Sequence, residues 1–274
     1  MAHEGNWEAD MAVGTSDADL IVNRQHLPFR MDGGIAGRAA IGLVVLATDQ
    51  TIEHEFRRLI DLPGVAFYES RILNDAAITP ETLKRMEGRL AEAASLILPG
   101  LALDVVAFGC TSASMVIGEE RVFERIREAR PGVACTTPIT AAFAAFRALG
   151  ARRIALLTPY RDDVNRFIRD YVEARGVSVP VMGSFNEEDD LKAARIDAAS
   201  IRDAAIELGR SDRIDAVFVS CTSLRLADAI AEIEEALGKP VTSSNHAMAW
   251  HGLRLAGIGD VRHGQGRLFE LPLL

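Results

Sequence analysis

A short cysteine-containing segment occurs twice in the chain, each time directly after an apolar run. The first copy, FGCTS, covers residues 108–112, and the second, VSCTS, covers residues 219–223. The apolar run at 41–47 also recurs, at 154–158, at almost the same offset along the chain. Two landmarks that repeat at one period predict an internal duplication with one cysteine in each half. Such a chain can bring both thiols together across a pseudo-twofold cleft.

Apolar runs of strand length alternate with helical patterns along most of the chain. Strands that are apolar throughout and alternate with helices are typical of parallel sheets covered on both faces. The sequence therefore predicts an α/β fold of two pseudo-twofold-related lobes, each a parallel sheet flanked by helices. Strands are expected at 41–47, 104–108, 132–136, 153–157, 177–182, 215–219 and 240–243. Helices are expected to start at Thr79-Pro80-Glu81 and to cover 119–129, 138–149, 162–175, 196–209, 224–237 and 246–255.

Composition excludes several classes of protein. The 274 residues, 49% of them hydrophobic, are enough for two lobes of ordinary size. A net charge of −9 without a block of Lys or Arg argues against nucleic-acid and anionic-membrane partners. No apolar run approaches the ~18 residues of a membrane helix, and a signal-peptide pattern is absent, so we expect a cytoplasmic protein. Residues 1–39, which are mostly polar and aperiodic, are expected to form an N-terminal extension that wraps the body or an oligomer partner.

The sequence gives no indication of a metal or organic cofactor. Three cysteines without a C-x-x-C pair and six histidines fit neither a disulfide framework nor a zinc site, so the thiols are expected to be reduced. No G-x-G-x-x-G or G-x-x-x-x-G-K-[ST] pattern follows any predicted strand. We therefore expect chemistry that depends on side chains alone.

Cys110 and Cys221 are the candidate reactive groups. Both are expected at the carboxyl end of a parallel strand, where active sites of such sheets lie, and just before a helix. Unpaired backbone N–H groups and the helix dipole would lower the pKa of a thiol there and could also hold a substrate carboxylate. The alternative is that both are small core residues, which the symmetry of the two copies disfavours. Cys135 has no counterpart and is expected to be a core residue.

Two loops that are equivalent under the duplication should face each other near the cysteines. One is Thr48-Asp49-Gln50-Thr51, and the other contains Thr158-Pro159-Tyr160 and Asp163-Val164-Asn165. The Tyr160 hydroxyl and the Asn165 amide could bind a carboxylate without adding charge, although a capped turn explains the same residues. Asp49 is a general acid or base, a partner for a substrate ammonium group, or a loop cap. Gln50 is expected beside it in the substrate site.

The remaining polar motifs have simpler interpretations. The segment Ser243-Ser244-Asn245-His246 could contribute hydroxyls or an imidazole near Cys221. His246 and His251, on an apolar helix, are more readily explained as structural histidines than as catalysts. The acidic run 187–190 is explained most simply as a solvated helix start.

Together these motifs resemble the aspartate/glutamate racemase superfamily. The two G/S-C-T-S segments, Thr-Pro-Tyr followed by Asp-Val-Asn, and the sequence VTSSNHAMAW at 241–250 carry the resemblance. Within the superfamily the chain is most similar to the branch of maleate cis-trans isomerases, arylmalonate decarboxylases and ectoine-utilisation racemase-like proteins. The resemblance extends from residue 41 to about residue 257.

The resemblance implies a substrate cleft between two α/β lobes. The first lobe is expected to comprise residues 40–137 together with 247–274, and the second residues 138–246. The resemblance also implies an oligomer, either a dimer or a tetramer. In maleate isomerases the cysteine that corresponds to Cys110 is the nucleophile, and the one that corresponds to Cys221 assists as proton donor or partner. In racemases the two thiols are opposed acid and base. Arylmalonate decarboxylases keep only the second-half cysteine, which makes a decarboxylase less favoured here. Tyr160 and Asn165 match carboxylate contacts of the isomerases.

Asp49 departs from the isomerase pattern, which has an asparagine in this loop. An ammonium-bearing substrate, such as a diaminobutyrate derivative from ectoine breakdown, would pair with Asp49 where maleate would be repelled. The resemblance therefore favours the ectoine-utilisation proteins over maleate itself.

The sequence thus predicts a cofactor-independent isomerase or racemase of a small carboxylate or amino acid, with Cys110 and Cys221 as the catalytic pair. Backbone N–H groups at Thr111, Ser112, Thr222 and Ser223 would stabilise the carboxylate or a developing enolate. The alternatives are a decarboxylase, in which Cys221 protonates an enolate, and a non-catalytic small-anion binding protein.

Overall fold

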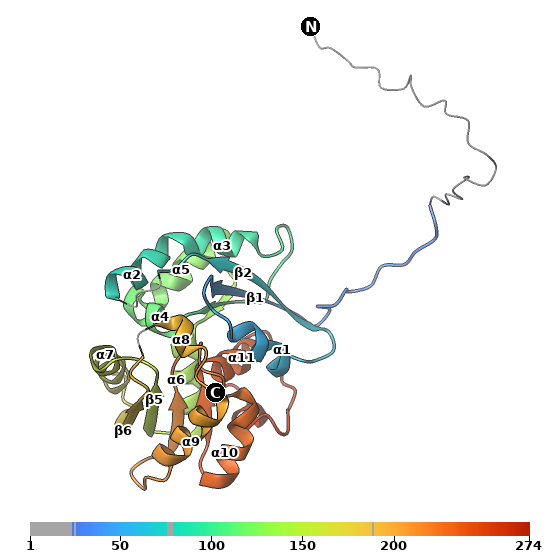
Figure 1. Ribbon diagram of the computed structural model, residues 1–274. Coiled ribbons are helices and arrows are strands. Elements are labelled where there is room, and N and C mark those ends of the chain that lie inside the picture. The colour runs from blue at the N-terminus through green and yellow to red at the C-terminus, as the bar shows by residue number, and fades with distance from the viewer. Residues whose placement is uncertain (1–23, 25, 76–78, 188) are drawn as a thin grey trace, which may run out of the picture. The chain divides into compact units, whose positions relative to one another are not determined.

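The computed structural model describes residues 24, 26–75, 79–187 and 189–274 (Figure 1). The chain divides into two compact units, residues 1–32 and Gly33–Leu274. Residues 24 and 26–32, the described part of the first unit, contain no helix or strand. Most of the extension expected over 1–39 lies outside the described residues. The larger unit contains the whole α/β fold.

Two parallel sheets of four strands form the framework of the larger unit. The first sheet has the order β2-β1-β3-β4 and the second has the order β6-β5-β7-β8, with parallel neighbours throughout. The identical strand order confirms the predicted fold of two related parallel sheets flanked by helices. The strands are β1 (Ala39–Leu46), β2 (Val65–Ile72), β3 (Val105–Gly109), β4 (Ala134–Thr136), β5 (Arg153–Thr158), β6 (Ser178–Ser184), β7 (Ala216–Val219) and β8 (Val241–Ser243).

Helices cover both faces of each sheet, as the apolar strands require. One face of the first sheet packs on α2, α3 and α5, and the other on α1, α6 and α11, while the second sheet packs on α6, α7, α9 and α10 (Figure 1). The α-helices are α1 (Ile52–Leu59), α2 (Pro80–Arg85), α3 (Leu90–Leu96), α4 (Thr111–Ile117), α5 (Glu119–Ala129), α6 (Pro138–Leu149), α7 (Asp162–Glu173), α8 (Asp190–Ala193), α9 (Ala198–Gly209), α10 (Ile230–Leu237) and α11 (Ser244–Leu255). The 3₁₀ turns are η2 (Met86–Arg89), η3 (Ala227–Ala229) and η4 (Arg267–Glu270).

Local sequence signals explain several of the helix ends. Thr79 caps α2 by accepting a hydrogen bond from the backbone N–H of Thr82, and Pro80 follows as the first helical residue. Thr137 caps α6 in the same way, and Gly150 ends that helix with a φ of 67°. Only a residue without a Cβ adopts this left-handed conformation at little cost.

The structure corrects two parts of the predicted pattern. The helix expected over 224–237 begins only at Ile230, because residues 222–229 form a turn and η3. The chain also contains β2, α1, α3 and α4, for which the sequence pattern gave no separate element. Strand β2 was missed because it is half-buried along most of its length and mixes polar with apolar residues. The lobe boundaries expected at 137/138 and 246/247 remain a prediction.

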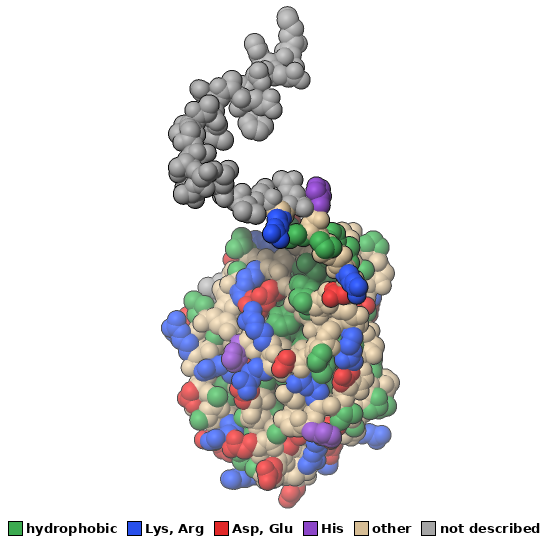
Figure 2. Space-filling view, turned by 90° about the vertical axis from the view of Figure 1, so that its right-hand side faces the viewer, with side chains coloured by type: hydrophobic (Ala, Val, Ile, Leu, Met, Phe, Trp, Pro, Cys, Tyr) green, Lys and Arg blue, Asp and Glu red, His purple; other side chains and the backbone are tan. Residues whose placement is uncertain are grey.

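Charged groups of both signs are interspersed on the face of the molecule shown in Figure 2. This face carries no patch of a single sign, in agreement with the absence of a Lys/Arg block from the sequence. In the part of the chain that the structure describes, no helix is long and apolar enough to cross a membrane.

A buried carboxylate on α1 connects the two sheet systems. Glu55 is 3% exposed, and its Oε1 accepts hydrogen bonds from the backbone N–H groups of Leu226 and Ala227, both at 2.7 Å. Its Oε2 accepts one from Asn245 Nδ2 at 2.7 Å. Glu55 thus holds the backbone N–H groups of Leu226 and Ala227, at the start of η3. Burial raises the pKa of Glu55 to about 7.

We expect Glu55→Gln to flatten the dependence of stability on pH. Because the folded-state pKa of Glu55 is raised, its contribution is fully present below the unfolded pKa of about 4.5 and is lost as the pH rises through about 7. The wild-type free energy of unfolding should therefore fall by roughly 2–3 kcal/mol more than that of the variant over this range. Urea unfolding at a series of pH values measures this. Glu232→Gln, at an exposed glutamate, is the control, and parallel curves for wild type and Glu55→Gln would contradict the expectation.

Candidate active site

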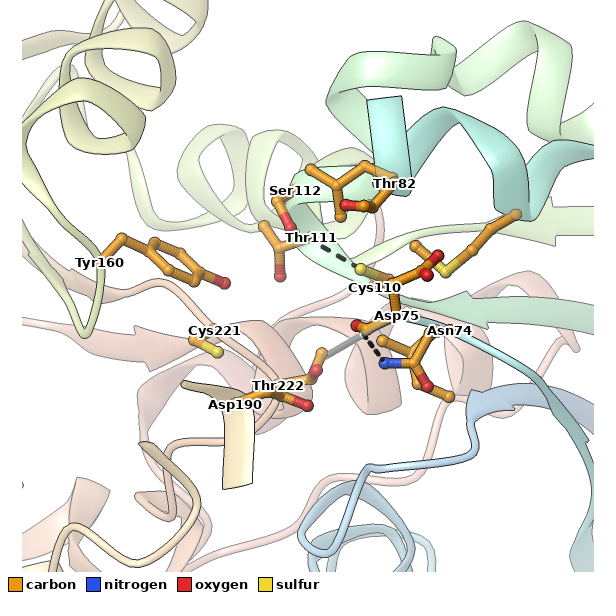
Figure 3. Close-up of a pocket in the computed structure, with 13 residues that line it drawn as sticks. Asn74, Asp75, Thr82, Cys110, Thr111, Ser112, Tyr160, Asp190, Cys221 and Thr222 are labelled. Carbon is orange, nitrogen blue, oxygen red and sulfur yellow. Dashed lines mark hydrogen bonds between the residues drawn. The ribbon is translucent and has the colours of Figure 1, made fainter. Parts of the chain in front are cut away.

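A small cavity lies at the carboxyl ends of the strands, between elements of the first and second sheets (Figure 3). Its volume is about 30 Å³, so only a compact ligand can be enclosed without movement of the walls. Six of the predicted site residues meet here: Cys110, Thr111, Ser112, Tyr160, Cys221 and Thr222. The other lining residues are Leu46, Asn74, Asp75, Thr82, Leu83, Met86 and Asp190.

Cys110 follows β3 and is the N-cap residue of α4. It is 5% exposed, and its Sγ lies 3.8 Å from the Ser112 hydroxyl. Gly109 directly before it allows close packing, because a Cβ there would lie 2.6 Å from Cδ1 of Ile52 on α1. The predicted position of Cys110 at a strand end and a helix start is confirmed.

Cys221 follows β7, but it precedes a turn instead of a helix. The expectation that a helix dipole acts on this thiol is therefore wrong. Its Sγ, which is on a residue only 3% exposed, instead accepts a hydrogen bond from the Ser223 N–H at 3.4 Å. The backbone N–H of Cys221 donates to Ser244 Oγ at 3.1 Å, and the same oxygen is 2.9 Å from Thr111 Oγ1. Ser244 thus connects the two cysteine loops.

Both thiols are protonated in this state of the site. The pKa of Cys110 and that of Cys221 are each raised to about 12, mainly by burial and in part by the charge of Asp190. Asp49 adds to the effect on Cys110. Hydrogen bonds from nearby N–H and hydroxyl groups lower both values only in part. The expected lowering of the thiol pKa does not occur, because loss of hydration outweighs the local dipoles.

The tyrosine loop after β5 contributes one side chain to the cavity. Tyr160 is 5% exposed and points its hydroxyl toward the cysteine loops (Figure 3). Burial and the two thiols hold its pKa well above the usual range. Asn165 does not line the cavity: its Nδ2 donates to the Tyr160 carbonyl oxygen at 2.8 Å, and its Oδ1 accepts from the Thr158 hydroxyl. Asn165 therefore holds the loop that carries Tyr160.

The equivalent loop after β1 carries Asp49 and Gln50. Gln50 is exposed and does not line the cavity. Asp49 is buried, and its Oδ1 accepts hydrogen bonds from the backbone N–H groups of Thr51 and Ile52, both at 2.8 Å. This atom therefore acts as a cap for α1. Burial raises the pKa of Asp49 to about 6.

Asp190 is a site residue that the sequence pattern did not identify. The interpretation of 187–190 as only a solvated helix start is wrong for this residue, whose side chain lines the cavity (Figure 3). Its Oδ1 accepts from the Ser223 hydroxyl at 2.7 Å and its Oδ2 from the Thr48 hydroxyl at 2.8 Å. The segment after β6 corresponds under the duplication to the segment after β2, which contributes Asn74 and Asp75 to the cavity. Because the sequence pattern did not indicate β2, this correspondence is visible only in the structure.

The structural interpretations of the remaining candidates are confirmed. His246 is buried, with Nδ1 2.9 Å from the Thr242 hydroxyl and Nε2 2.6 Å from the Gln265 carbonyl oxygen. Burial lowers the pKa of His246 and of His251 to about 4, so both are neutral. Cys135 packs in the core of the first sheet, where burial raises its pKa to about 11.

We expect Cys110 and Cys221 to react slowly with iodoacetamide at neutral pH in the absence of a ligand. The thiolate is the reactive species, and burial keeps it scarce until the pH is far above 9. Mass spectrometry of peptides after timed alkylation at pH 7 to 10 measures each rate. Free cysteine under the same conditions is the control, and alkylation of either residue as fast as free cysteine at pH 7 would contradict the expectation.

The sequence of this chain is similar to those of arylmalonate decarboxylases and maleate isomerases. The family model of arylmalonate decarboxylase matches residues 41–269. Arylmalonate decarboxylase from Bordetella bronchiseptica is 34% identical over 242 residues, which is 86% of this chain and 98% of that protein. Maleate isomerase from Nocardia farcinica is 28% identical over 244 residues, 85% of this chain and 96% of that protein.

Comparison of the fold with solved structures identifies the same group of proteins. The structure of a Nocardia farcinica maleate cis-trans isomerase mutant with a covalently bound succinylcysteine intermediate superposes with a TM-score of 0.77 at 26% identity, covering 85% of this chain and 98% of the other. These findings confirm the resemblance to the maleate isomerase and arylmalonate decarboxylase branch of the Asp/Glu racemase-like proteins. With a family match that extends through both sheets and both cysteine loops, the chain belongs to the arylmalonate decarboxylase family.

Proposed function

We propose that this protein is a cofactor-independent isomerase or racemase of a small carboxylate or amino acid, in which Cys110 and Cys221 act as a pair. The observation that carries the proposal is the convergence of the two thiols on one enclosed cavity from equivalent positions after β3 and β7. A buried, unpaired cysteine is ordinary in a core. Two of them beside a tyrosine hydroxyl in the same cavity are the groups that proton transfer at carbon requires.

Two thiols can invert a carbon next to a carboxylate without any other reagent. One of them, as thiolate, takes the proton from that carbon, and the electron pair passes into the carboxylate as an enolate. The other thiol then gives its proton to the opposite face of the carbon. The substrate regains one proton and the two sulfurs exchange roles, so atoms and charge balance.

A cis-trans isomerisation needs only one covalent bond to sulfur. The Cys110 thiolate adds to one alkene carbon, and the electron pair of the double bond moves to the neighbouring carbon and its carboxylate. Rotation about the resulting single bond and expulsion of the thiolate give the other isomer. The succinylcysteine captured in the Nocardia farcinica maleate isomerase supports the ability of a cysteine in this fold to form such a bond.

The substrate carboxylate is proposed to bind at the cysteine loops. The first-turn N–H groups of α4, at Thr111 and Ser112, have no acceptor within their own helix and can stabilise an enolate oxygen. Thr222 and Ser223 would contribute from the other half, and Tyr160 would donate its hydroxyl hydrogen. Asn165 would act through the loop that it holds, whereas Gln50, which is exposed and does not line the cavity, is not proposed as a contact.

A second candidate reaction is decarboxylation, which the family membership and the 34% identity to arylmalonate decarboxylase favour. In that reaction carbon dioxide leaves a malonate-type acid, and Cys221 protonates the enolate that remains. The same carboxylate contacts would serve this chemistry.

We further propose that the protein acts in the cytoplasm as a dimer or tetramer.

Proton NMR in D₂O with a panel of small acids tests the function. Maleate, both enantiomers of aspartate and glutamate, diaminobutyrate with its N-acetyl derivatives, and a phenylmalonate form the panel. Conversion of maleate to fumarate would identify a cis-trans isomerase, exchange of an α-proton a racemase, and carbon dioxide release a decarboxylase.

Cys110→Ser and Cys221→Ser should each reduce the rate of isomerisation or racemisation by about 10³-fold or more. The two thiols act in one reaction, so the loss of either one removes most of the rate enhancement of the pair. Cys135→Ser, in the core, is the matched control and should retain activity in protein that remains folded. Full activity of either Cys110→Ser or Cys221→Ser would exclude the two-thiol mechanism. If only the Cys110→Ser variant retained activity, and carbon dioxide were released, the decarboxylase reaction would be favoured.

A further inference from the structure

A single buried hydroxyl lies between the two cysteine loops. It belongs to Ser244, the first residue of α11, which is fully buried. Its Oγ accepts a hydrogen bond from the backbone N–H of Cys221 at 3.1 Å and lies 2.9 Å from Oγ1 of Thr111. Cys221 belongs to the loop after β7 of the second sheet, whereas Thr111 belongs to the loop after β3 of the first. One side chain therefore contacts the loops that carry both thiols.

The start of α11 does not require this hydroxyl. The N-cap of α11 is Ser243, whose side chain accepts a hydrogen bond from the His246 N–H at 3.2 Å. The helix at the equivalent place in the first half, α6, has Thr137 as its N-cap and begins at Pro138, which has no hydroxyl. The role of the Ser244 hydroxyl therefore lies in its contacts with the cysteine loops and not in capping the helix.

The direction of each hydrogen bond follows from the protons available. The Cys221 N–H can only donate, so Ser244 Oγ is the acceptor in that contact. Among the described residues, the only other group within hydrogen-bonding distance of Ser244 Oγ is Thr111 Oγ1. If Thr111 donated to Ser244, the Ser244 proton would be buried without an acceptor, which is costly. Ser244 therefore donates to Thr111.

This arrangement leaves the hydroxyl proton of Thr111 for a ligand. Thr111 is 1% exposed and lines the cavity together with Tyr160 and Cys110 (Figure 3). Within the described part of the chain, its hydroxyl has no hydrogen-bond partner other than Ser244. Because Thr111 Oγ1 accepts from Ser244, its own proton is available to an acceptor in the cavity. Each hydrogen bond in such a chain polarises the next one, which strengthens the last donor.

We propose that Ser244 is a positioning residue, which fixes the Thr111 hydroxyl as a hydrogen-bond donor toward an oxygen of the bound carboxylate and joins this donor to the Cys221 loop. The choice of a carboxylate as ligand rests on the proposed function. An ionised oxygen is the acceptor that such a donor favours, because hydrogen bonds to charged groups are stronger than those between neutral groups. Ser244 itself does not line the cavity, so it acts through Thr111.

Isothermal titration calorimetry with malonate and succinate at neutral pH tests the proposal. Ser244→Ala should weaken the binding of either acid by about fivefold, because the Thr111 hydroxyl loses the group that orients and polarises it. Thr111→Val, which removes the hydroxyl and nearly keeps the shape, should weaken binding by about tenfold or more. Ser220→Ala is the matched control and should leave the affinity unchanged. Ser220 is equally buried, directly precedes Cys221, and has a hydroxyl with no partner among the described residues.

A double variant separates positioning from a general structural role. If Ser244 acts through Thr111, adding Ser244→Ala to Thr111→Val should change the affinity by less than about twofold, whereas independent effects would multiply. Circular dichroism verifies folding. If the alanine variant does not fold, the cycle is measured with Ser244→Cys, which replaces the hydroxyl by a weaker hydrogen-bonding group of similar shape. Multiplied effects, or wild-type affinity in the Ser244 variant, would overturn the proposal.

Turnover of the acid panel separates this inference from the proposed function. If the wild type binds malonate or succinate with the expected coupling but converts no acid, the positioning role of Ser244 stands and the catalytic proposal fails. If the wild type converts an acid and Ser244→Ala binds both probes as tightly as the wild type, the catalytic proposal stands and the positioning role fails. A wild type that binds neither probe would also overturn the positioning role.

Discussion

Removal of the two thiols from water is the constraint on which the chemistry of this fold depends. Parallel strands in two sheets end at one cavity, and the cysteines that follow β3 and β7 are 5% and 3% exposed. Desolvation is the largest influence on the pKa of each, larger than the hydrogen bonds that favour the thiolate. The burial that holds the sulfurs in position therefore also keeps them protonated in the absence of a ligand.

Polar contacts across the cavity hold its two sides in register. Thr51 Oγ1 donates to the Ser223 carbonyl oxygen at 3.0 Å, and Asn245 Nδ2 donates to that of Thr222 at 2.8 Å. Ser244 joins the two cysteine loops, and Glu55 fixes the chain beyond Cys221. Apolar packing alone would bring the sheets together without fixing these loops, whereas directional bonds between buried groups specify their geometry.

The positions of the cysteines could be predicted because a strand end is a local property. An apolar run followed by Cys-Thr-Ser fixes where the sulfur leaves the sheet, and the repeated motif indicated that the two sites are related. Asp190 could not be found in this way, since an acidic residue in a loop has the same pattern whether it faces solvent or a cavity. The thiol pKa values were also beyond local reasoning, because burial depends on packing from both halves. The segment after Cys221 is hydrogen-bonded to Glu55, a residue far away in sequence, and local patterns give no sign of such a contact.

The duplication leaves the two thiols in different surroundings, which bears on their roles. Cys110 caps a helix and has a neighbouring hydroxyl at Ser112, so a negative charge on its sulfur gains from the N–H groups of the first turn. Cys221 has no helix behind it, but a backbone N–H at 3.4 Å and the Tyr160 hydroxyl both act on its sulfur. Asp190 opposes charge at Cys221 more than any other group except burial itself. These differences agree with the proposed roles, in which Cys110 becomes the thiolate and Cys221 keeps its proton until the carbon takes it, although burial and Asp190 raise the pKa of both thiols to about 12.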